Sequence, residues 1–154
     1  MPDASHVGRV YRAPGMVIEA ERARAFAGAI AGADPVVEPD AVPPTFAAVY
    51  CLFPTLGRLF GDREVGIDLA GLIHGEQQFS FHEPVWPGDV VDSQARIASV
   101  QERRGMTFVE IDLEATRDDR PVCSGRALLV VRASGSSHPA DSAPDHRESA
   151  GTPR

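Results

Sequence analysis

Lysine is absent from this sequence: all 15 of its basic residues are arginine. That absence excludes Schiff-base chemistry, an ammonium general base and the phosphate-binding lysine of a P-loop. Acidic residues number 22, and the formal net charge is -7. Because nucleic-acid binding needs a clustered basic surface, this composition argues against it. Docking of an acidic partner would have to use local arginines such as Arg103 and Arg104.

Cysteine and long apolar runs are scarce as well. Cys51 and Cys123 are the only cysteines. Both have apolar neighbours and neither has the spacing of a zinc site, so they are interpreted as buried free thiols in a reducing compartment. No apolar run approaches the ~20 residues that a membrane-spanning helix needs, and the N-terminal residues lack the pattern of a secretion signal. The sequence therefore predicts a cytoplasmic protein without membrane association, metal or cofactor.

The length and the two ends of the chain predict one domain. The 154 residues suffice for one hydrophobic core but not for two. Residues 134–154 contain no large apolar side chain, and this segment is predicted to be a disordered tail. Residues 1–8 are predicted to be a flexible N-terminus. The folded domain is expected to span residues 9–133.

Hydrophobic periodicity divides this domain into a helical first half and a stranded second half. A helix is predicted over residues 19–30. Residues 46–60 are apolar nearly all round, which predicts an enclosed helix that Pro54 kinks or divides. Farther along the period becomes two, and strands are predicted over residues 72–82, 90–100, 106–116 and 122–132. The expected fold class is α+β, with an antiparallel sheet wrapped round a buried central helix.

The stretch HGEQQFSFHEPVWPGD, residues 74–89, concentrates the polar chemistry of the second half. In a regular strand, one face would carry every second side chain, namely His74, Glu76, Gln78, Ser80 and His82. His74 and Glu76 would then touch and could act as an acid–base couple. The alternative is a half-solvated strand whose polar row faces solvent or another subunit. A metal site is not predicted, because no third ligand stands at a suitable spacing.

Several short motifs follow one another along the chain. They are ARAFA at 23–27, DP at 34–35, PPTF at 43–46, LIHGEQ at 72–77, FHEP at 81–84 and PGD at 87–89. Together they resemble the MaoC-like dehydratases and hydratases, and more closely the FAS1-like dehydratase or MaoC N-terminal branch. That branch includes non-catalytic subunits of heterodimeric (R)-specific 3-hydroxyacyl-thioester dehydratases. The resemblance covers residues 8–133 and implies a single hot-dog domain.

The catalytic motif of that family is altered here. Catalytic MaoC-like subunits resemble one another in an Asp-x-Asn-Pro-x-His segment before the central helix, whose Asp and His transfer the protons. Aligning Pro35 with the proline of this segment puts Gly32 in the place of the Asp and Val37 in the place of the His. Neither side chain can transfer a proton. The resemblance therefore implies a chain without the usual catalytic pair, and leaves Asp34 and Asp40 as fallback carboxylates.

The resemblance implies a non-catalytic subunit of a dehydratase or enoyl hydratase. A catalytic MaoC-like partner would supply the Asp and His, in a heterodimer or a dimer of heterodimers. The substrate would be an acyl-CoA or acyl-carrier-protein thioester of fatty acid or polyketide metabolism. This chain would contribute the acyl-chain tunnel, for which the candidate residues are Phe46, Tyr50, Phe53 and Leu56.

Two other functions stay open at this point. One is a homodimeric hot-dog thioesterase or hydratase that uses His74 with Glu76, or Asp34 with Asp40. The other is a module that binds an acyl thioester and carries out no chemistry.

Overall fold

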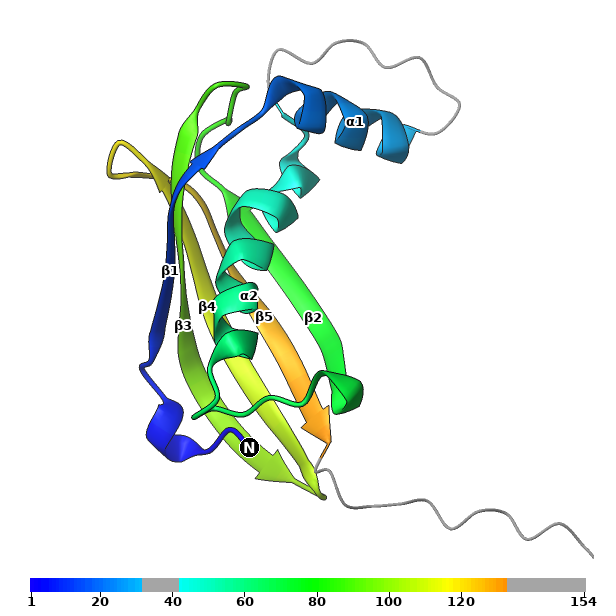
Figure 1. Ribbon diagram of the computed structural model, residues 1–154, viewed down its shortest axis with the longest axis vertical. Helices are drawn as coiled ribbons and strands as arrows, with labels where there is room; N and C mark the ends of the chain where they lie inside the picture. Colours follow the sequence, from blue (N-terminus) through cyan, green and yellow to red (C-terminus); the bar gives the residue numbers. More distant parts are fainter. Residues whose placement is uncertain (32–41, 133–154) are drawn as a thin grey trace, which may run out of the picture.

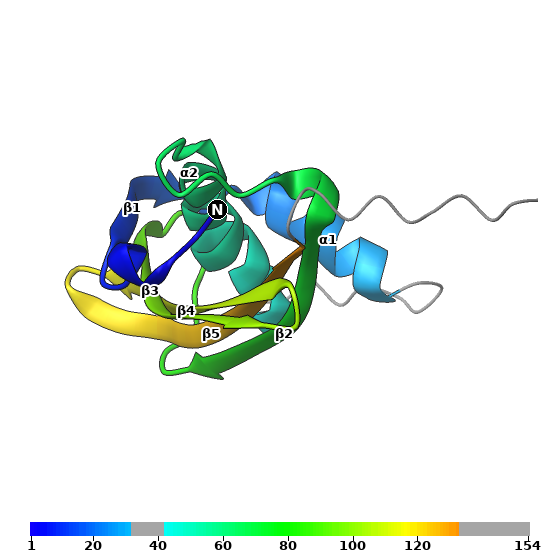
Figure 2. The ribbon, with the colours of Figure 1, turned by 90° about the horizontal axis from the view of Figure 1, so that it is seen from below.

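A five-stranded antiparallel sheet curls around one central helix in the computed structural model of this chain (Figures 1 and 2). The structure describes residues 1–31 and 42–132. The expected α+β fold with one enclosed helix is confirmed. In the order β1-β3-β4-β5-β2, the two edges are β1 and β2. The strands are Val10–Val17 (β1), Leu72–Phe81 (β2), Val90–Arg103 (β3), Met106–Arg117 (β4) and Arg120–Arg132 (β5).

Strand β1 is the element that the periodicity did not reveal. Tyr11 and Ala13 point into the core, but Pro14 and Gly15 follow and break the alternation. The pairing register with β3 shifts between Ala13 and Met16, and Gly15 has a φ of 74°. A proline and a bulge are both tolerated at a sheet edge because no further strand needs the missing hydrogen bond. The sheet context, and not the local pattern, makes this segment a strand.

The first helix, α1, spans Ala20–Ala31, close to the predicted 19–30, and lies across one end of the sheet (Figure 1). The central helix changes type along its length. A 3-10 turn at Pro44–Phe46 leads into π-helical turns at Ala48–Leu52 and then into α2, Phe53–Gly61. The predicted division of this helix therefore takes the form of a change in helical winding.

Pro54 explains where that change occurs. It lies in the first turn of α2, where its missing N–H removes no necessary helical hydrogen bond. The neighbouring Thr55 is fully buried, and its hydroxyl donates to the carbonyl oxygens of Cys51 and Leu52, each at 2.9 Å. A buried hydroxyl without such acceptors would be destabilising.

The hydrophobic core lies between α2 and the concave face of the sheet. Leu56 and Leu59 of α2 are at most 4% exposed, as are Ile97, Ile111 and Leu129 of the sheet. Burying each such side chain contributes about 1.5–3 kcal/mol.

Near the end of α2, Asp62 joins the helix to β1. Asp62 accepts hydrogen bonds from Arg9 at 2.7 Å and from the Tyr11 hydroxyl at 2.9 Å. Burial, together with this carboxylate, raises the pKa of Tyr11 to about 12. Tyr11 therefore stays a hydrogen-bond donor throughout the neutral range.

The N-terminal segment also lies against the sheet. Ala4–His6 form a short 3-10 turn capped by Asp3. The Gly8 N–H then donates to the Ile97 carbonyl at 2.8 Å.

Candidate functional site: a cleft at the start of the central helix

A cleft of about 410 Å³ lies where the central helix begins. One wall consists of Val42, Pro43, Pro44 and Tyr50, and the other is the segment from Phe81 to Val85. The two walls are joined by a hydrogen bond from the Val42 N–H to the Val85 carbonyl at 2.9 Å. Small-molecule sites are usually mainly apolar and about 300–1,000 Å³ in volume. The cleft therefore has the size and lining for a small apolar group.

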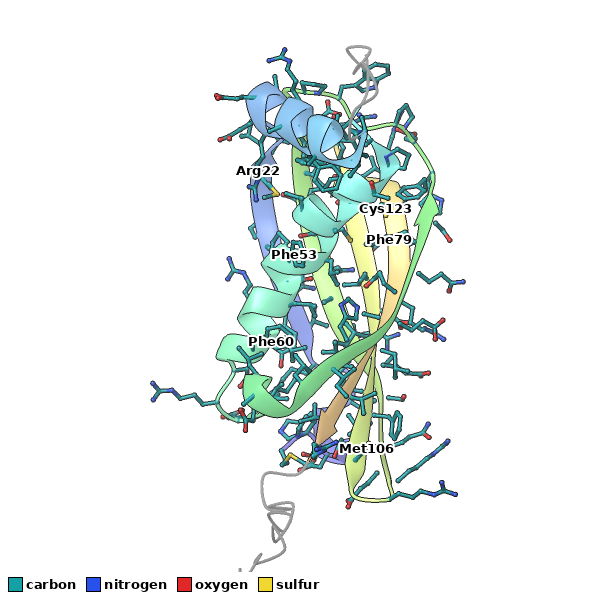
Figure 3. The ribbon with its side chains drawn as sticks, turned by 90° about the vertical axis from the view of Figure 1, so that its right-hand side faces the viewer. Arg22, Phe53, Phe60, Phe79, Met106 and Cys123 are labelled. Atoms are coloured by element: carbon teal, nitrogen blue, oxygen red, sulfur yellow. The ribbon has the colours of Figure 1, made fainter. Side chains whose placement is uncertain are left out.

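Of the predicted tunnel residues, one reaches this cleft. Tyr50 lines it. Phe46 is 2% exposed and packs edge to face on Phe26 of α1, with ring centroids 5.2 Å apart. Leu56 is 4% exposed within the core, whereas Phe53 is 61% exposed on the outside of the helix. Figure 3 shows Phe53 and Phe60 on this helix and Phe79 on the strand that passes beside it. A role for these residues in substrate binding stays a prediction.

Tyr50 is the polar group on the helix side of the cleft. Its side chain is 2% exposed, and burial raises its pKa above the ordinary value, with the nearby cysteines adding to the shift. The hydroxyl is therefore protonated at neutral pH and can act as a hydrogen-bond donor. The neighbouring Cys51 and Cys123 are buried free thiols, as predicted. The thiol of Cys51 has a raised pKa because of its hydrogen bond with Cys123 and its burial.

His82 is the histidine among the residues of the opposite wall, and the sequence reasoning did not select it. It follows the last residue of β2, and its Nε2 lies 2.8 Å from the hydroxyl oxygen of Ser124 on β5. The sequence signal was present, since His82 precedes Glu83-Pro84, which ends the strand. The sequence did not show which neighbouring strand would provide the hydrogen-bond partner of His82.

A charged cluster holds the β2–β3 loop that forms this wall. Arg117 of β4 donates to Glu83 at 3.0 Å and to Asp89 at 2.5 Å. Asp89 also accepts the Trp86 N–H at 2.8 Å, and Arg117 makes a further contact with the Pro84 carbonyl at 3.2 Å. The hydrogen bond to Asp89 and the charges of both carboxylates raise the pKa of Arg117. One guanidinium therefore fixes both ends of the loop.

Replacing Arg117 by glutamine is expected to lower the free energy of unfolding by about 2 kcal/mol, because hydrogen bonds to charged groups contribute about 1.5–3 kcal/mol. Urea denaturation followed by circular dichroism measures this change. The control is Arg120→Gln, an exposed arginine at the adjacent hairpin, which should change the stability by less than about 0.5 kcal/mol. Equal losses in the two variants would show that the cluster is not stabilising.

The predicted arrangement of His74 and Glu76 on one face is wrong. The pairing of β2 with β5 shifts between these two residues, so that His74 lies opposite Leu129 and Glu76 lies opposite Leu128. Directly paired residues project to the same face of a sheet, and neighbours along a strand project to opposite faces. Leu129 is buried on the concave face, so the bulge at Gly75 separates His74 from Glu76. The opposite directions of the two side chains disfavour the pair as an acid–base couple.

Other predicted sites lie elsewhere. Asp34 and Asp40, together with Gly32 and Val37, lie outside the described residues, as does the tail 134–154. Arg103 ends β3 and Arg104 follows it in the β3–β4 turn. This turn lies at the opposite end of the sheet from α1 (Figure 1).

Neither metal nor membrane features emerge from the described ranges. Within residues 1–31 and 42–132, no three side chains of the metal-binding types come together as a cation site. In the same residues, no helix has the length and apolar character to span a bilayer.

Fold and cleft define the class of this protein, a single hot-dog domain with an apolar cleft at the start of its central helix. The chain belongs to the family described as FAS1-like, dehydratase domain region, whose model matches residues 5–124. A UPF0336 protein of Saccharopolyspora erythraea is 29% identical to it over 143 residues, which cover 84% of this chain and 91% of that protein.

Solved structures agree with this assignment. A chain of the C-terminally truncated HadBC complex of Mycobacterium tuberculosis, a 3R-hydroxyacyl-ACP dehydratase, matches with a TM-score of 0.66 and 28% identity, covering 81% of this chain and 96% of that chain. A MaoC-like dehydratase matches with a TM-score of 0.67 and 20% identity, covering 97% of this chain and 53% of its own. At the lower identity the likeness shows the fold alone.

Proposed function

We propose that this chain is the non-catalytic, acyl-binding subunit of an (R)-specific 3-hydroxyacyl-thioester dehydratase or enoyl-thioester hydratase. The observation that carries the proposal is a mainly apolar cleft whose lining, among the residues that the structure describes, contains no Asp–His pair. The histidine and the carboxylate among the described lining residues are His82 and Glu83, and Glu83 is paired with Arg117. In the resemblance to catalytic MaoC-like subunits, Gly32 and Val37 would take the places of the catalytic Asp and His.

The dehydration needs an acid and a base, and a catalytic partner subunit would provide both. In the dehydration, a base removes the proton from C2, an acid protonates the C3 hydroxyl as it leaves as water, and amide groups stabilise the thioester oxygen. A MaoC-like partner would supply the acid and the base. This chain would hold the acyl group in place, which lowers the barrier by restricting its orientation. The 28% identity to a chain of HadBC, a 3R-hydroxyacyl-ACP dehydratase, supports an acyl thioester as the ligand.

The two sheet edges differ in a way that supports pairing through β2. Both edge strands contain a bulge, but β1 also carries Pro14, which discourages addition of another strand. The β2 sequence, LIHGEQQFSF, contains neither proline nor arginine. It leaves Ile73 56% exposed and Phe81 49% exposed. A long edge strand with exposed apolar side chains is an association site. We propose that the partner's sheet continues this one at β2.

The purified chain alone is expected not to hydrate crotonyl-CoA, whereas the chain co-purified with a catalytic MaoC-like subunit is expected to be active. The measurement is the loss of absorbance of the enoyl thioester. The catalytic subunit alone serves as the control. The proposal requires that the activity or the substrate range of this subunit changes when the present chain is added. Full activity of the isolated chain would overturn the proposal and favour the homodimeric enzyme. Tight thioester binding without any effect on a partner would favour the binding module.

A further inference from the structure

We propose that Tyr50 selects acyl chains that carry an oxygen atom, to which its hydroxyl donates a hydrogen bond inside the cleft. The ligand class is an acyl thioester with a keto group along an otherwise apolar chain. This inference rests on the function proposed above and names the kind of acyl group that the chain would hold. It concerns the part of the acyl group beyond the reacting carbons, which would lie with the catalytic subunit.

The Tyr50 hydroxyl is the polar group that the cleft leaves available to a ligand. The other polar side chains among the described lining residues are His82 and Glu83. Nε2 of His82 lies 2.8 Å from the hydroxyl oxygen of Ser124, on the outer face of the sheet, and Glu83 is paired with Arg117. The rest of the described lining is valine, proline and phenylalanine. In a mainly apolar site, a few polar groups fix the orientation of the ligand.

Packing holds the Tyr50 ring in one position. Tyr50 belongs to the π-helical turns at Ala48–Leu52 and is 2% exposed. Its ring packs on Phe46, with ring centroids 6.3 Å apart, and its hydroxyl reaches the thiol of Cys123 on β5. Cys123 pairs directly with Phe81, which belongs to the opposite wall of the cleft. The phenol therefore extends from the central helix to the strand pair that carries this wall.

The Tyr50 hydroxyl has no strong acceptor in the protein. Among the described residues, no nitrogen or oxygen atom forms a hydrogen bond with it, and the sulfur of Cys123 is a weak acceptor. Gln77 Oε1 is the described side-chain atom that is both fully covered and unpaired. The Tyr50 oxygen, which is also unpaired, therefore keeps contact with the space of the cleft. Burial raises the pKa of this phenol, so it remains a donor at neutral pH.

A ligand oxygen would satisfy this donor, whereas a plain hydrocarbon chain would cover it and leave it unpaired. A buried hydroxyl without a partner is destabilising. A site that is built to hydrogen-bond its ligand therefore rejects an analogue that lacks the matching group. A charged oxygen is disfavoured, because burying a charge in an apolar cleft is costly. A neutral keto oxygen meets both requirements.

The test compares decanoyl-CoA with 5-oxo-, 7-oxo- and 9-oxodecanoyl-CoA, which are saturated and so cannot be hydrated. Isothermal titration calorimetry measures their binding to the full chain, alone and in complex with a catalytic subunit. One oxo position is expected to bind about ten-fold more tightly than the plain chain, because it pairs the buried hydroxyl. Tyr50→Phe is expected to remove this preference and to bind decanoyl-CoA at least as tightly as the unmodified chain does.

Infrared spectroscopy of the ligand provides a second measurement. The stretching band of a ¹³C-labelled keto group is expected to move to lower frequency when the preferred ligand binds the unmodified chain, because a hydrogen bond weakens the carbonyl bond. In Tyr50→Phe the band should keep the frequency of a keto group in an apolar solvent. Should Tyr50→Phe not fold, this band in the unmodified chain decides the question, and an unshifted band overturns the inference.

Tyr11→Phe is the matched control, because it removes the same atom from the other tyrosine of the chain. The Tyr11 hydroxyl is bound to Asp62, and Tyr11 does not belong to the described lining of the cleft. This variant should have a lower Tm and keep the keto preference, whereas Tyr50→Phe should keep or raise the Tm.

Two outcomes separate this inference from the proposed function. If decanoyl-CoA binds but no oxo ligand is preferred, or if Tyr50→Phe keeps the preference, the role of Tyr50 is overturned while the proposed function stands. If no ligand of the series binds the chain, alone or with a catalytic subunit, both are overturned.

Discussion

Replacing Ile73 by arginine is expected to abolish assembly with the catalytic subunit, and with it the activity of the complex. Ile73 is 56% exposed on β2 and would be covered when a second sheet pairs with this edge. A charge buried without a partner costs about 3–5 kcal/mol, which weakens binding by roughly 100-fold or more. The isolated variant should keep its melting temperature, because the arginine replaces a side chain that the monomer leaves exposed. Analytical size exclusion and the enoyl-thioester assay measure the two effects.

The sheet provides its own control for this experiment. Val17 lies on the other edge strand, β1, and is also 56% exposed. Val17→Arg introduces the same charge at an apolar side chain of the same fractional exposure, but at an edge that already carries Pro14. It is expected to leave assembly and activity unchanged. Loss of assembly in both variants, or in neither, would show that β2 is not the partner edge.

Gly125→Ala is expected to lower the free energy of unfolding by about 3 kcal/mol, because overpacking at a site without space costs about 1–3 kcal/mol or more. A Cβ atom added at Gly125 would lie 2.3 Å from the Gln78 carbonyl oxygen and 3.0 Å from the ring of Phe79. The oxygen belongs to the backbone of β2, so the strand itself must move away from β5. Thermal unfolding should show a decrease of about 10 °C in Tm.

The consequence of this change should extend to the cleft. β2 leads directly into the loop that carries His82 and Glu83, so displacing the strand moves that wall. The matched control is Gly57→Ala in α2, where an added Cβ meets no atom within 4 Å. Since alanine is the better helix former by about 1 kcal/mol, that variant should be as stable as the unmodified chain or slightly more so. Similar destabilisation in both variants would contradict the role assigned to Gly125.

Much of the fold was predictable because its local patterns and its tertiary environment agree. Residues 46–60 are apolar nearly all round, and only enclosure by a sheet can bury such a helix. The period-two pattern from Met106 to Thr116 matches β4, whose alternate residues Val109, Ile111 and Leu113 are buried. Both patterns report which side chains leave water, and burial of apolar surface is the main driving force of folding.

The candidate site was predictable only in part. Tyr50 was selected as a tunnel residue from its place in an apolar helix, and it does line the cleft. His74 and Glu76 were paired on the assumption of a regular strand, which the register shift at Gly75 removes. His82 was set aside as one more member of a polar row, yet it is the histidine of that row that belongs to the lining residues of the cleft.

The sequence by itself determined the fold class, the enclosed helix, four of the five strands and the absence of lysine. These features depend on residue types and on spacings within one segment. Only the tertiary structure decided that Val10–Val17 is a strand, that His74 and Glu76 lie on opposite faces, and that His82 meets Ser124. Each of these depends on the pairing of strands far apart in the chain, and the energy of that pairing comes from neighbours that a local pattern does not contain.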